Sequence, residues 1–175
     1  VITGNSHISA GASVQPYCFL KDCFVGGGTT VRSTFADNAR IGARCEIGPF
    51  ACLRPGSVVG DGCRVGDFVE VKNSSLGDGV KAAHLAYIGD AAVGGGTNVG
   101  CGTVFANYDG REKHRTTVGR NCFLGCNVNL VAPLTLGDGV FVAAGTTVTD
   151  DAGENSFVIG RSRQQTKRKK EKDGE

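Results

Sequence analysis

Aliphatic side chains recur every six residues along most of the chain, and small or polar residues fill the positions between them. One run contains Ile41, Ile47, Leu53, Val59, Val65 and Val71, and another contains Val118, Leu124, Leu130, Leu136, Val142 and Val148. Five residues replace six at the joints from Leu20 to Val25, from Val71 to Leu76 and from Ile88 to Val93. A helix has a period of 3.6 and a simple strand a period of two, so neither explains this pattern.

A coil with three flat sides explains a period of six. Each side is one short strand, and the aliphatic side chain points inward and stacks on its equivalent one coil away. Glycine directly follows many of the aliphatic residues, as at Gly42, Gly60 and Gly125, and we expect it to supply the φ angles that the corners require. With parallel strands roughly 4.8 Å apart, about nine coils predict a three-sided prism roughly 40–45 Å long.

Small residues occupy the position four places after most of the aliphatic residues. Four of the eight cysteines lie there, namely Cys18, Cys45, Cys63 and Cys122, and we interpret them as small hydrophobic side chains near the corners. By the same count, Cys23, Cys52, Cys101 and Cys126 lie outside this position. Because packing accounts for many of the thiols, no disulfide framework is needed and a reducing, cytoplasmic location is predicted.

The composition agrees with short strands joined by many turns. The 175 residues include 28 Gly, no Trp and no Met, and this length suits one compact domain with a tail. The absence of Met favours a chain cut from a longer protein. No stretch approaches the roughly 20 apolar residues of a membrane span, and no signal sequence opens the chain.

Two segments depart from the repeat. FANYDGREKHRTT, residues 105–117, breaks the rhythm of six and must leave the prism as a loop, the kind of segment where function concentrates. We place the repeat domain at residues 1–160 and a basic C-terminal tail at residues 161–175, which hold seven basic and three acidic side chains. The tail is either a solvated, frayed end or an arm that attracts phosphate. Nucleic-acid binding is disfavoured, because the repeats show no basic patch with interleaved aromatic residues.

Four longer motifs carry a resemblance to a known family. They are GPFACLRPGS, GDFVEVKNSSLGDGVKAAHLAYIGDA, TNVGCGTVFANYDGREKHRT and LVAPLTLGDGVFVAAGTTVTDDAGENSFVIGRSRQ. Through them the chain resembles the hexapeptide-repeat acyltransferases, and within these the C-terminal acetyltransferase domain of bacterial bifunctional N-acetylglucosamine-1-phosphate uridyltransferase / glucosamine-1-phosphate N-acetyltransferases. The resemblance covers nearly the whole chain and implies an all-β fold, a left-handed parallel β-helix. Nothing in the sequence resembles the family's uridyltransferase domain.

The resemblance implies transfer of acetyl from acetyl-CoA to the amine of glucosamine 1-phosphate. The product, N-acetylglucosamine 1-phosphate, would supply the UDP-N-acetylglucosamine used for peptidoglycan and lipid A. An ammonium group cannot attack a thioester, so a base must remove a proton, and histidine suits this role near neutral pH. KAAHLAY places His84 at the family's base position, FVEVK places Glu70 where a carboxylate orients that base, and Asn107 is expected near the thioester. The structural alternatives are a packed His84 and a solvated Glu70.

The remaining site residues follow from the same motifs. Arg54, Lys72 and Lys113 are expected to hold the sugar phosphate as cations, and Tyr87 and Asn98 to bind the sugar hydroxyls. The residues expected to hold acetyl-CoA are Cys101, Asn107, Tyr108, Cys126, Ala144 and Arg161. The family often has Ala and Ser where this chain has Cys101 and Cys126. In the family the loop reaches a neighbouring subunit, so the resemblance also implies a homotrimer with active sites between subunits.

Other interpretations stay open. A zinc enzyme on this fold needs three converging histidines, whereas His7, His84 and His114 are scattered along the chain, and no metal site is predicted. An inert remnant of an enzyme, or a purely structural prism, would keep the repeat without turnover. An acetyltransferase for another amino sugar would keep the base. An ice-binding face would need a regular array of Thr, but GTTV occurs only at Gly28 and Gly145.

Overall fold

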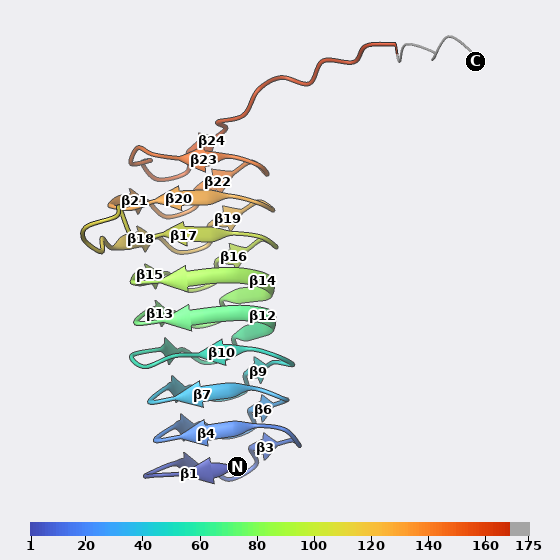
Figure 1. The fold of residues 1–175 in the computed structure, drawn as a ribbon, viewed down its shortest axis with the longest axis vertical. Helices are drawn as coiled ribbons and strands as arrows, with labels where there is room; N and C mark the ends of the chain where they lie inside the picture. Colours follow the sequence, from blue (N-terminus) through green and yellow to red (C-terminus); the bar gives the residue numbers. More distant parts are fainter. Residues whose placement is uncertain (169–175) are drawn as a thin grey trace.

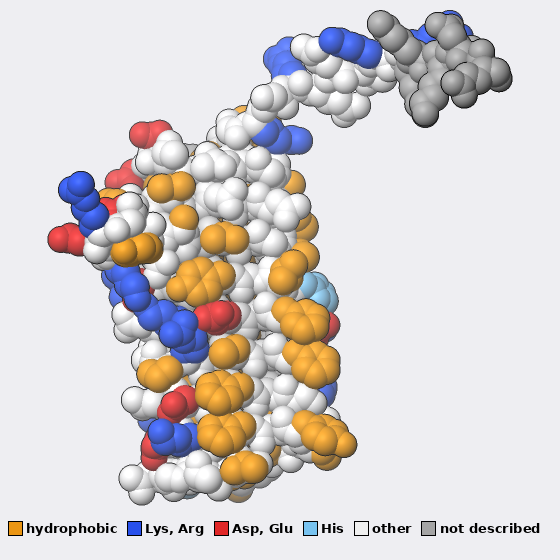
Figure 2. All heavy atoms as spheres, in the orientation of Figure 1, with side chains coloured by type: hydrophobic (Ala, Val, Ile, Leu, Met, Phe, Trp, Pro, Cys, Tyr) orange, Lys and Arg blue, Asp and Glu red, His pale blue; other side chains and the backbone are white. Residues whose placement is uncertain are grey.

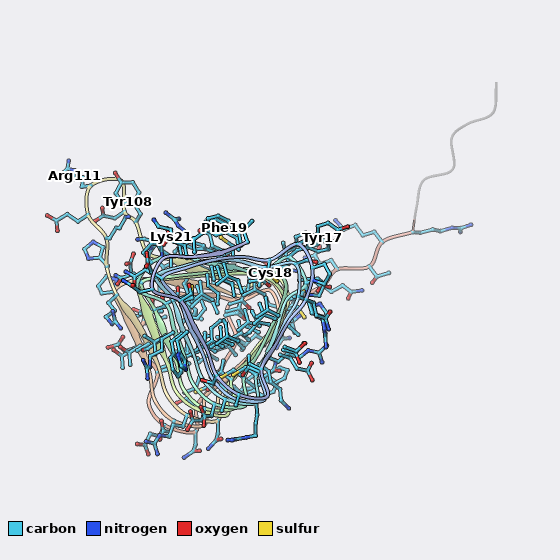
Figure 3. All side chains as sticks on the ribbon, turned by 90° about the horizontal axis from the view of Figure 1, so that it is seen from below. Tyr17, Cys18, Phe19, Lys21, Tyr108 and Arg111 are labelled. Carbon is cyan, nitrogen blue, oxygen red and sulfur yellow. The ribbon has the colours of Figure 1, made fainter. Side chains whose placement is uncertain are left out.

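The structure, a computed structural model, describes residues 1–168 and is a left-handed parallel β-helix of triangular cross-section (Figures 1 and 3). Aliphatic and β-branched residues occupy its flat sides, while Gly, Asn and Asp are common at its corners, as their backbone preferences dictate. Every pairing between its strands is parallel and joins one coil to the next. The predicted three-sided prism of about nine coils is confirmed.

Each coil gives one short strand to each of three faces. Face 1 contains β1 (Ile2–Thr3), β4 (Phe19–Lys21), β7 (Phe35–Asp37), β10 (Cys52–Leu53), β12 (Arg64–Lys72), β14 (Lys81–Gly89), β17 (Val104–Ala106), β20 (Asn129–Val131) and β23 (Thr147–Val148). Face 2 contains β2 (His7–Ile8), β5 (Phe24–Val25), β8 (Arg40–Ile41), β11 (Val58–Val59), β13 (Ser75–Leu76), β15 (Ala91–Val93), β18 (Thr116–Val118) and β21 (Leu134–Leu136). Face 3 contains β3 (Ser13–Val14), β6 (Thr30–Val31), β9 (Glu46–Ile47), β16 (Asn98–Val99), β19 (Phe123–Leu124), β22 (Phe141–Val142) and β24 (Phe157–Val158). The nine-residue strands β12 and β14 turn the corner from face 3 to face 1 and belong to both.

The interior consists of apolar stacks, one behind each face. Behind face 1 the strand register aligns the buried side chains of Leu20, Ala36, Leu53, Val71, Ile88, Phe105, Leu130 and Val148. Phe105 is the largest fully buried side chain. Because each coil rests on the one below, the stacks fix the coils in register and hold the outward-facing side chains at set positions.

The small buried position is set by the next core residue rather than by the previous one. Cys18, Cys45, Cys63 and Cys122 are buried as predicted, each two residues before an inward aliphatic. Cys23 is also two residues before one, Val25, and is only 2% exposed, so the prediction that it lies elsewhere is wrong. At a five-residue joint, one residue is missing between the previous aliphatic residue and the small buried residue. Counting four places from the previous aliphatic therefore gives the residue that follows the buried one. For the same reason Ser74 and Ala91, not Ser75 and Ala92, are the buried residues at the other two joints.

Glycine has two roles in the coils, and the prediction assigned the wrong one to the glycines that follow the aliphatics, except Gly48, whose φ is +85°. Gly60 does not have a positive φ. A Cβ built on it would lie 2.8 Å from the carbonyl carbon of Gly77 in the next coil, so lack of space excludes a side chain. Gly62, two residues later, has a φ of +64° and no atom within 4 Å of a built Cβ. The corner conformation is therefore supplied by the later glycine.

The tail and the middle of the predicted loop leave the prism (Figure 1). The ends of the predicted loop do not, because Phe105 is a buried residue of β17 and Thr116 and Thr117 belong to β18. The loop occupies residues 107–115, between β17 and β18, and forms a small hairpin in which Tyr108 and Lys113 make an antiparallel bridge. After β24 the chain extends away from the prism through residues 161–168, which contain no strand. The basic residues Lys169, Lys170 and Lys172 lie outside the described residues. No helix long and apolar enough to cross a membrane occurs in residues 1–168.

Candidate functional site

Most of the predicted sugar-phosphate residues lie on the outside of face 1, near its border with face 2. We call this border the loop corner, because the hairpin of residues 107–115 projects from it (Figure 3). Arg54 follows β10, Lys72 ends β12 and Tyr87 lies on β14. Alternation along each strand explains their outward direction: Val71 and Ile88 point into the core, so Lys72 and Tyr87 point out.

Two ion pairs and one like-charge contact organise the cations of this corner. The guanidinium of Arg54 donates to Oε1 of Glu70 at 2.9 Å, which raises the pKa of Arg54. Nζ of Lys72 lies 3.1 Å from Oδ2 of Asp90. The ammonium of Lys113, from the hairpin, lies beside that of Lys72, and this second positive charge lowers the pKa of Lys113. Three cations and two carboxylates thus converge, leaving one net positive charge for an anion to bind.

Asp90 is the central residue of this group, and the sequence prediction missed it. Its carboxylate accepts hydrogen bonds from Nζ of Lys72, from Nδ2 of Asn73 at 2.7 Å and, at short range, from Nδ2 of Asn107. Asn107 also donates to the hydroxyl of Tyr87 at 3.4 Å. Burial raises the pKa of Asp90, but the bonds from Asn73, Lys72 and Asn107 outweigh it, so the pKa is lowered. The only sequence signal was a carboxylate directly after the Gly89 that ends β14.

His84 lies at the opposite border of face 1, where β14 turns from face 3, and we call this border the His84 corner. Its side chain is 60% exposed, and Nδ1 lies 4.0 Å from Oδ2 of Asp67. Within one chain, the carboxylate near His84 is therefore Asp67, while Glu70 is bonded to Arg54. Five residues of strand separate His84 from Gly89, the register partner of Lys72. At the rise of a strand this is roughly 15 Å, so one chain does not bring the base to the cations.

Four of the six residues predicted to bind acetyl-CoA continue the His84 corner upward, whereas Asn107 and Tyr108 lie in the hairpin at the loop corner. Backbone hydrogen bonds connect successive corners: Gly102 N to Leu85 O at 2.6 Å, Asn127 N to Cys101 O at 2.8 Å, and Gly145 N to Cys126 O at 2.8 Å. The outward residues that precede each left-handed corner residue are His84, Cys101, Cys126 and Ala144. Cys101 and Cys126 are exposed, free thiols. Arg161 follows at the top, where its Cδ approaches Gly145.

A hollow of about 420 Å³ lies between the His84 corner and the middle of face 1. Phe68 and Leu85 line it on the corner side, and Glu70 and Tyr87 line it from the face. Asn98 lies on β16 of face 3, apart from this hollow and from the cations of the loop corner. Tyr108 lies in the hairpin and is exposed.

The His84 corner also carries an exposed apolar ladder. It consists of Tyr17, Phe50, Phe68 and Leu85, which are 92%, 58%, 64% and 56% exposed. The rings of Phe50 and Phe68 stack with centroids 5.6 Å apart. All four residues have positive φ, a conformation that is unusual and costly for large side chains. Figure 2 shows apolar side chains gathered along this edge, with basic side chains along the other edge of the same face. An exposed apolar stripe of this kind is typical of a surface that contacts another protein.

No group of three or more His, Cys, Asp or Glu side chains within residues 1–168 is arranged to hold a metal ion. His7 stacks on Phe24, and Nε2 of His114 lies 2.8 Å from Oδ2 of Asp109 in the hairpin.

Comparisons with known proteins agree with this architecture. The family described as bacterial transferase hexapeptide (six repeats) matches residues 38–73 and 115–150. The bifunctional protein GlmU of Geobacillus sp. (strain WCH70) is 50% identical over 167 residues, which are 95% of this chain and 36% of that protein. This chain therefore spans about a third of the length of that relative.

Solved structures show the same fold at low sequence identity. The Francisella novicida UDP-N-acetylglucosamine acyltransferase has a TM-score of 0.71 and 16% identity, covering 91% of this chain and 67% of that one. PerB from Caulobacter crescentus, solved in complex with CoA and GDP-perosamine, has a TM-score of 0.52 and 19% identity, covering 89% and 54%. Together the repeats, the prism and these comparisons show that the chain is similar to the bacterial hexapeptide transferases and, over 95% of its length, to one part of a bifunctional GlmU protein.

Proposed function

We propose that the protein transfers acetyl from acetyl-CoA to the amine of glucosamine 1-phosphate, in the bacterial cytoplasm. The observation that carries this proposal is the pairing of two features on one face. A cluster of Arg54, Lys72 and Lys113 at the loop corner suits a phosphate, and the line from His84 to Arg161 at the other corner suits a long thioester substrate. The 50% identity to a GlmU protein supports the same assignment.

The chemistry assigns a role to each group. His84 removes a proton from the ammonium of the sugar, whose nitrogen then attacks the thioester carbonyl, and the CoA thiolate leaves. Arg54, Lys72 and Lys113 hold the phosphate. Tyr87 would bind the sugar hydroxyls from face 1, whereas Asn98, on face 3, would reach them only from another copy of the chain. Proximity is the main requirement of such a two-substrate reaction, and rigid coils satisfy it by fixing every side chain.

Small side chains at the His84 corner suit the pantetheine arm of acetyl-CoA. Cys101, Cys126 and Ala144 would line this arm, and Arg161 at the top would meet the CoA phosphates. Asn107 and Tyr108 would approach the thioester from the hairpin. The basic tail from residue 161 adds positive charge at the same end. PerB, a relative in fold, was solved with CoA, in keeping with acyl-CoA use.

We further propose a homotrimer, because one chain leaves the site incomplete. His84 and the cations lie at opposite corners of face 1, roughly 15 Å apart by strand rise. Three copies in a closed ring would bring the His84 corner of one copy to the loop corner of the next, and would give three equivalent sites. In that arrangement Glu70 of one copy could orient His84 of its neighbour. The apolar ladder of Tyr17, Phe50, Phe68 and Leu85 would be buried in the contact.

The test is formation of N-acetylglucosamine 1-phosphate from acetyl-CoA and glucosamine 1-phosphate, measured by mass spectrometry. A thiol dye is unsuitable, because Cys101 and Cys126 are exposed and would react with it. Product that disappears in His84→Ala supports the proposal. Product from glucosamine or glucosamine 6-phosphate instead would assign a different amino sugar. No product from a verified trimer would identify the chain as an inert member of the family.

A further inference from the structure

Asp90 makes more polar contacts than its place at a turn requires. Its Oδ2 accepts from Lys72 Nζ at 3.1 Å and from Asn107, and its Oδ1 accepts from Asn73 at 2.7 Å and from Lys72 at 3.3 Å. The residue is only 8% exposed. A buried carboxylate with three donors is stabilised in its charged form, and it holds those donors in turn.

These contacts join three successive coils. Lys72 and Asn73 belong to the coil below Asp90, and Asn107 begins the hairpin in the coil above. Backbone hydrogen bonds also join these coils: Asp90 N donates to Lys72 O at 3.0 Å, and Thr116 N donates to Asp90 O at 3.3 Å. Asn107 is the first residue of the hairpin and Thr116 directly follows its last, so Asp90 holds one end through its carboxylate and the other through its backbone carbonyl.

The hairpin in turn is closed on Asn107. His114 N donates to Asn107 O at 2.8 Å, and Tyr108 and Lys113 form the antiparallel bridge. Fixing Asn107 therefore fixes Lys113, whose ammonium lies beside that of Lys72. Two ammonium groups repel each other, and the charge of Asp90 offsets that repulsion.

The backbone alone does not explain an aspartate here. The same left-handed corner is occupied by Asp22, Asn38 and Asn73 in lower coils, with φ values of 51°, 46° and 46°, and Asp90 has 50°. Asn38 and Asn73 show that an uncharged side chain satisfies this conformation. The charge at position 90 therefore has a further role.

We propose that Asp90 is the positioning residue of the anion-binding corner: it holds Lys72 and the hairpin that carries Lys113 so that both cations face one anionic group. The assignment of that anion to a sugar phosphate rests on the proposed function, whereas the positioning of the hairpin does not. Asp90 is not expected to contact the anion itself, because a carboxylate repels an anion and both of its oxygens already accept hydrogen bonds from Lys72, Asn73 and Asn107.

Charge and positioning predict opposite effects of Asp90→Asn. If Asp90 acted only as a negative charge near the anion, its removal would raise the positive charge of the corner and tighten binding. If Asp90 positions the cations, its removal releases Lys72 and Asn107 and weakens binding. The substitution adds no bulk and suits the left-handed corner, so the variant is expected to fold.

The experiment compares Asp90→Asn with Asp22→Asn in the full chain. Asp22 shares the corner conformation, and its Oδ1 accepts from the backbone N–H of Asn5 at 2.8 Å. Limited trypsin digestion, followed by mass spectrometry, measures cleavage after Arg111, Lys113 and Arg115 in the hairpin. Cleavage after Arg163 in the tail of the same molecules is the internal reference. KM for glucosamine 1-phosphate is measured in parallel.

We expect Asp90→Asn to speed hairpin cleavage about tenfold, as the loss of a charged hydrogen-bond acceptor would do. Asp22→Asn and cleavage after Arg163 should not change. KM should rise at least about fivefold, with a smaller change in kcat. An unchanged rate of hairpin cleavage, equal acceleration by Asp22→Asn, or a lower KM would each overturn the proposal. If the unsubstituted protein does not turn over glucosamine 1-phosphate, the proposed function fails, and the cleavage rates still decide whether Asp90 holds the hairpin.

Discussion

Alanine at Gly60 and at Gly62 separates the two roles of glycine in the coils. A Cβ at Gly60 would lie 2.8 Å from both Gly77 C and Asp78 N and 2.5 Å from Asp78 Oδ1. Carbon atoms in contact lie about 3.5–4.0 Å apart, so the next coil would have to move by about 1 Å. At Gly62 a Cβ meets no atom within 4 Å, and only its φ of +64° opposes a side chain.

The two substitutions should therefore differ in their effect on the free energy of unfolding. Overpacking costs about 1–3 kcal/mol. Moving the coil would also stretch the 2.8 Å bonds from Gly60 N to Leu76 O and from Asp61 N to Asp78 Oδ1, each worth about 1 kcal/mol. Gly60→Ala should thus lose about 3–5 kcal/mol. Gly62→Ala should lose only about 0.5–1.5 kcal/mol, because the left-handed penalty of about 1–2 kcal/mol is offset by a less disordered unfolded chain.

Thermal unfolding followed by circular dichroism, at one protein concentration, measures this difference. At about 2–4 °C per kcal/mol for a chain of this size, Gly60→Ala should lower Tm by about 6–20 °C and Gly62→Ala by about 1–6 °C. Arg44, at the equivalent corner of another coil with a φ of 55°, shows that this position accepts a side chain. Equal losses, or a greater loss at Gly62, would refute the assignment of steric exclusion to Gly60.

Four further predictions follow from the site. His84→Ala should lower kcat by about 10²–10⁴-fold with little change in Tm, because the side chain is 60% exposed, and near-normal turnover would exclude it as the base. Phe68→Asp should give an inactive monomer in sedimentation analysis, and an intact trimer would remove the apolar ladder from the interface. Brief alkylation of the native protein should label Cys101 and Cys126 first, and acetyl-CoA should slow both reactions; mass spectrometry of peptides identifies the sites. Hydrogen bonds from Glu112 N, His114 and Arg111 N lower the pKa of Asp109. The stabilisation of the hairpin by the Asp109 carboxylate should therefore persist below the ordinary pKa of about 3.9 and be lost only as the pH falls through the lowered value. An NMR titration midpoint at or above about 3.9 would contradict this.

The fold was predictable because the period of six is set by geometry that every coil repeats. Each inward aliphatic needs a partner above and below, so the pattern survives along the chain and can be read without knowledge of distant contacts. The joints were less predictable. At Cys23, Ser74 and Ala91 the spacing between two core aliphatics is five residues instead of six. The spacing alone does not show whether the missing residue lies before or after the small buried residue.

The motifs pointed to several residues that lie together, but not to their contacts. Arg54, Lys72, Tyr87, Asn107 and Lys113 lie at one corner, whereas His84 lies at the opposite corner and Asn98 on face 3. The roles assigned to these residues stay predictions. Their partners depend on which side chains stand above one another across coils, and this is settled by strand register. Asp90 was missed for that reason: its donors lie 17 or 18 residues away in sequence.

Because the coils stack evenly, the side chains of the His84 corner lie at regular intervals. His84, Cys101, Cys126 and Ala144 lie one to a coil, so the distance along the corner is fixed by the number of coils, at roughly 4.8 Å for each. The hairpin leaves this spacing unchanged, although it adds residues to its coil. Phe105 and Leu130, which pair in successive coils, are 25 residues apart in sequence (130 − 105), whereas Leu130 and Val148 are 18 apart (148 − 130). An insertion within a coil can therefore add side chains to a site without changing the distances along the His84 corner. The length of the corner changes only when a whole coil is gained or lost, so it varies in steps of one coil.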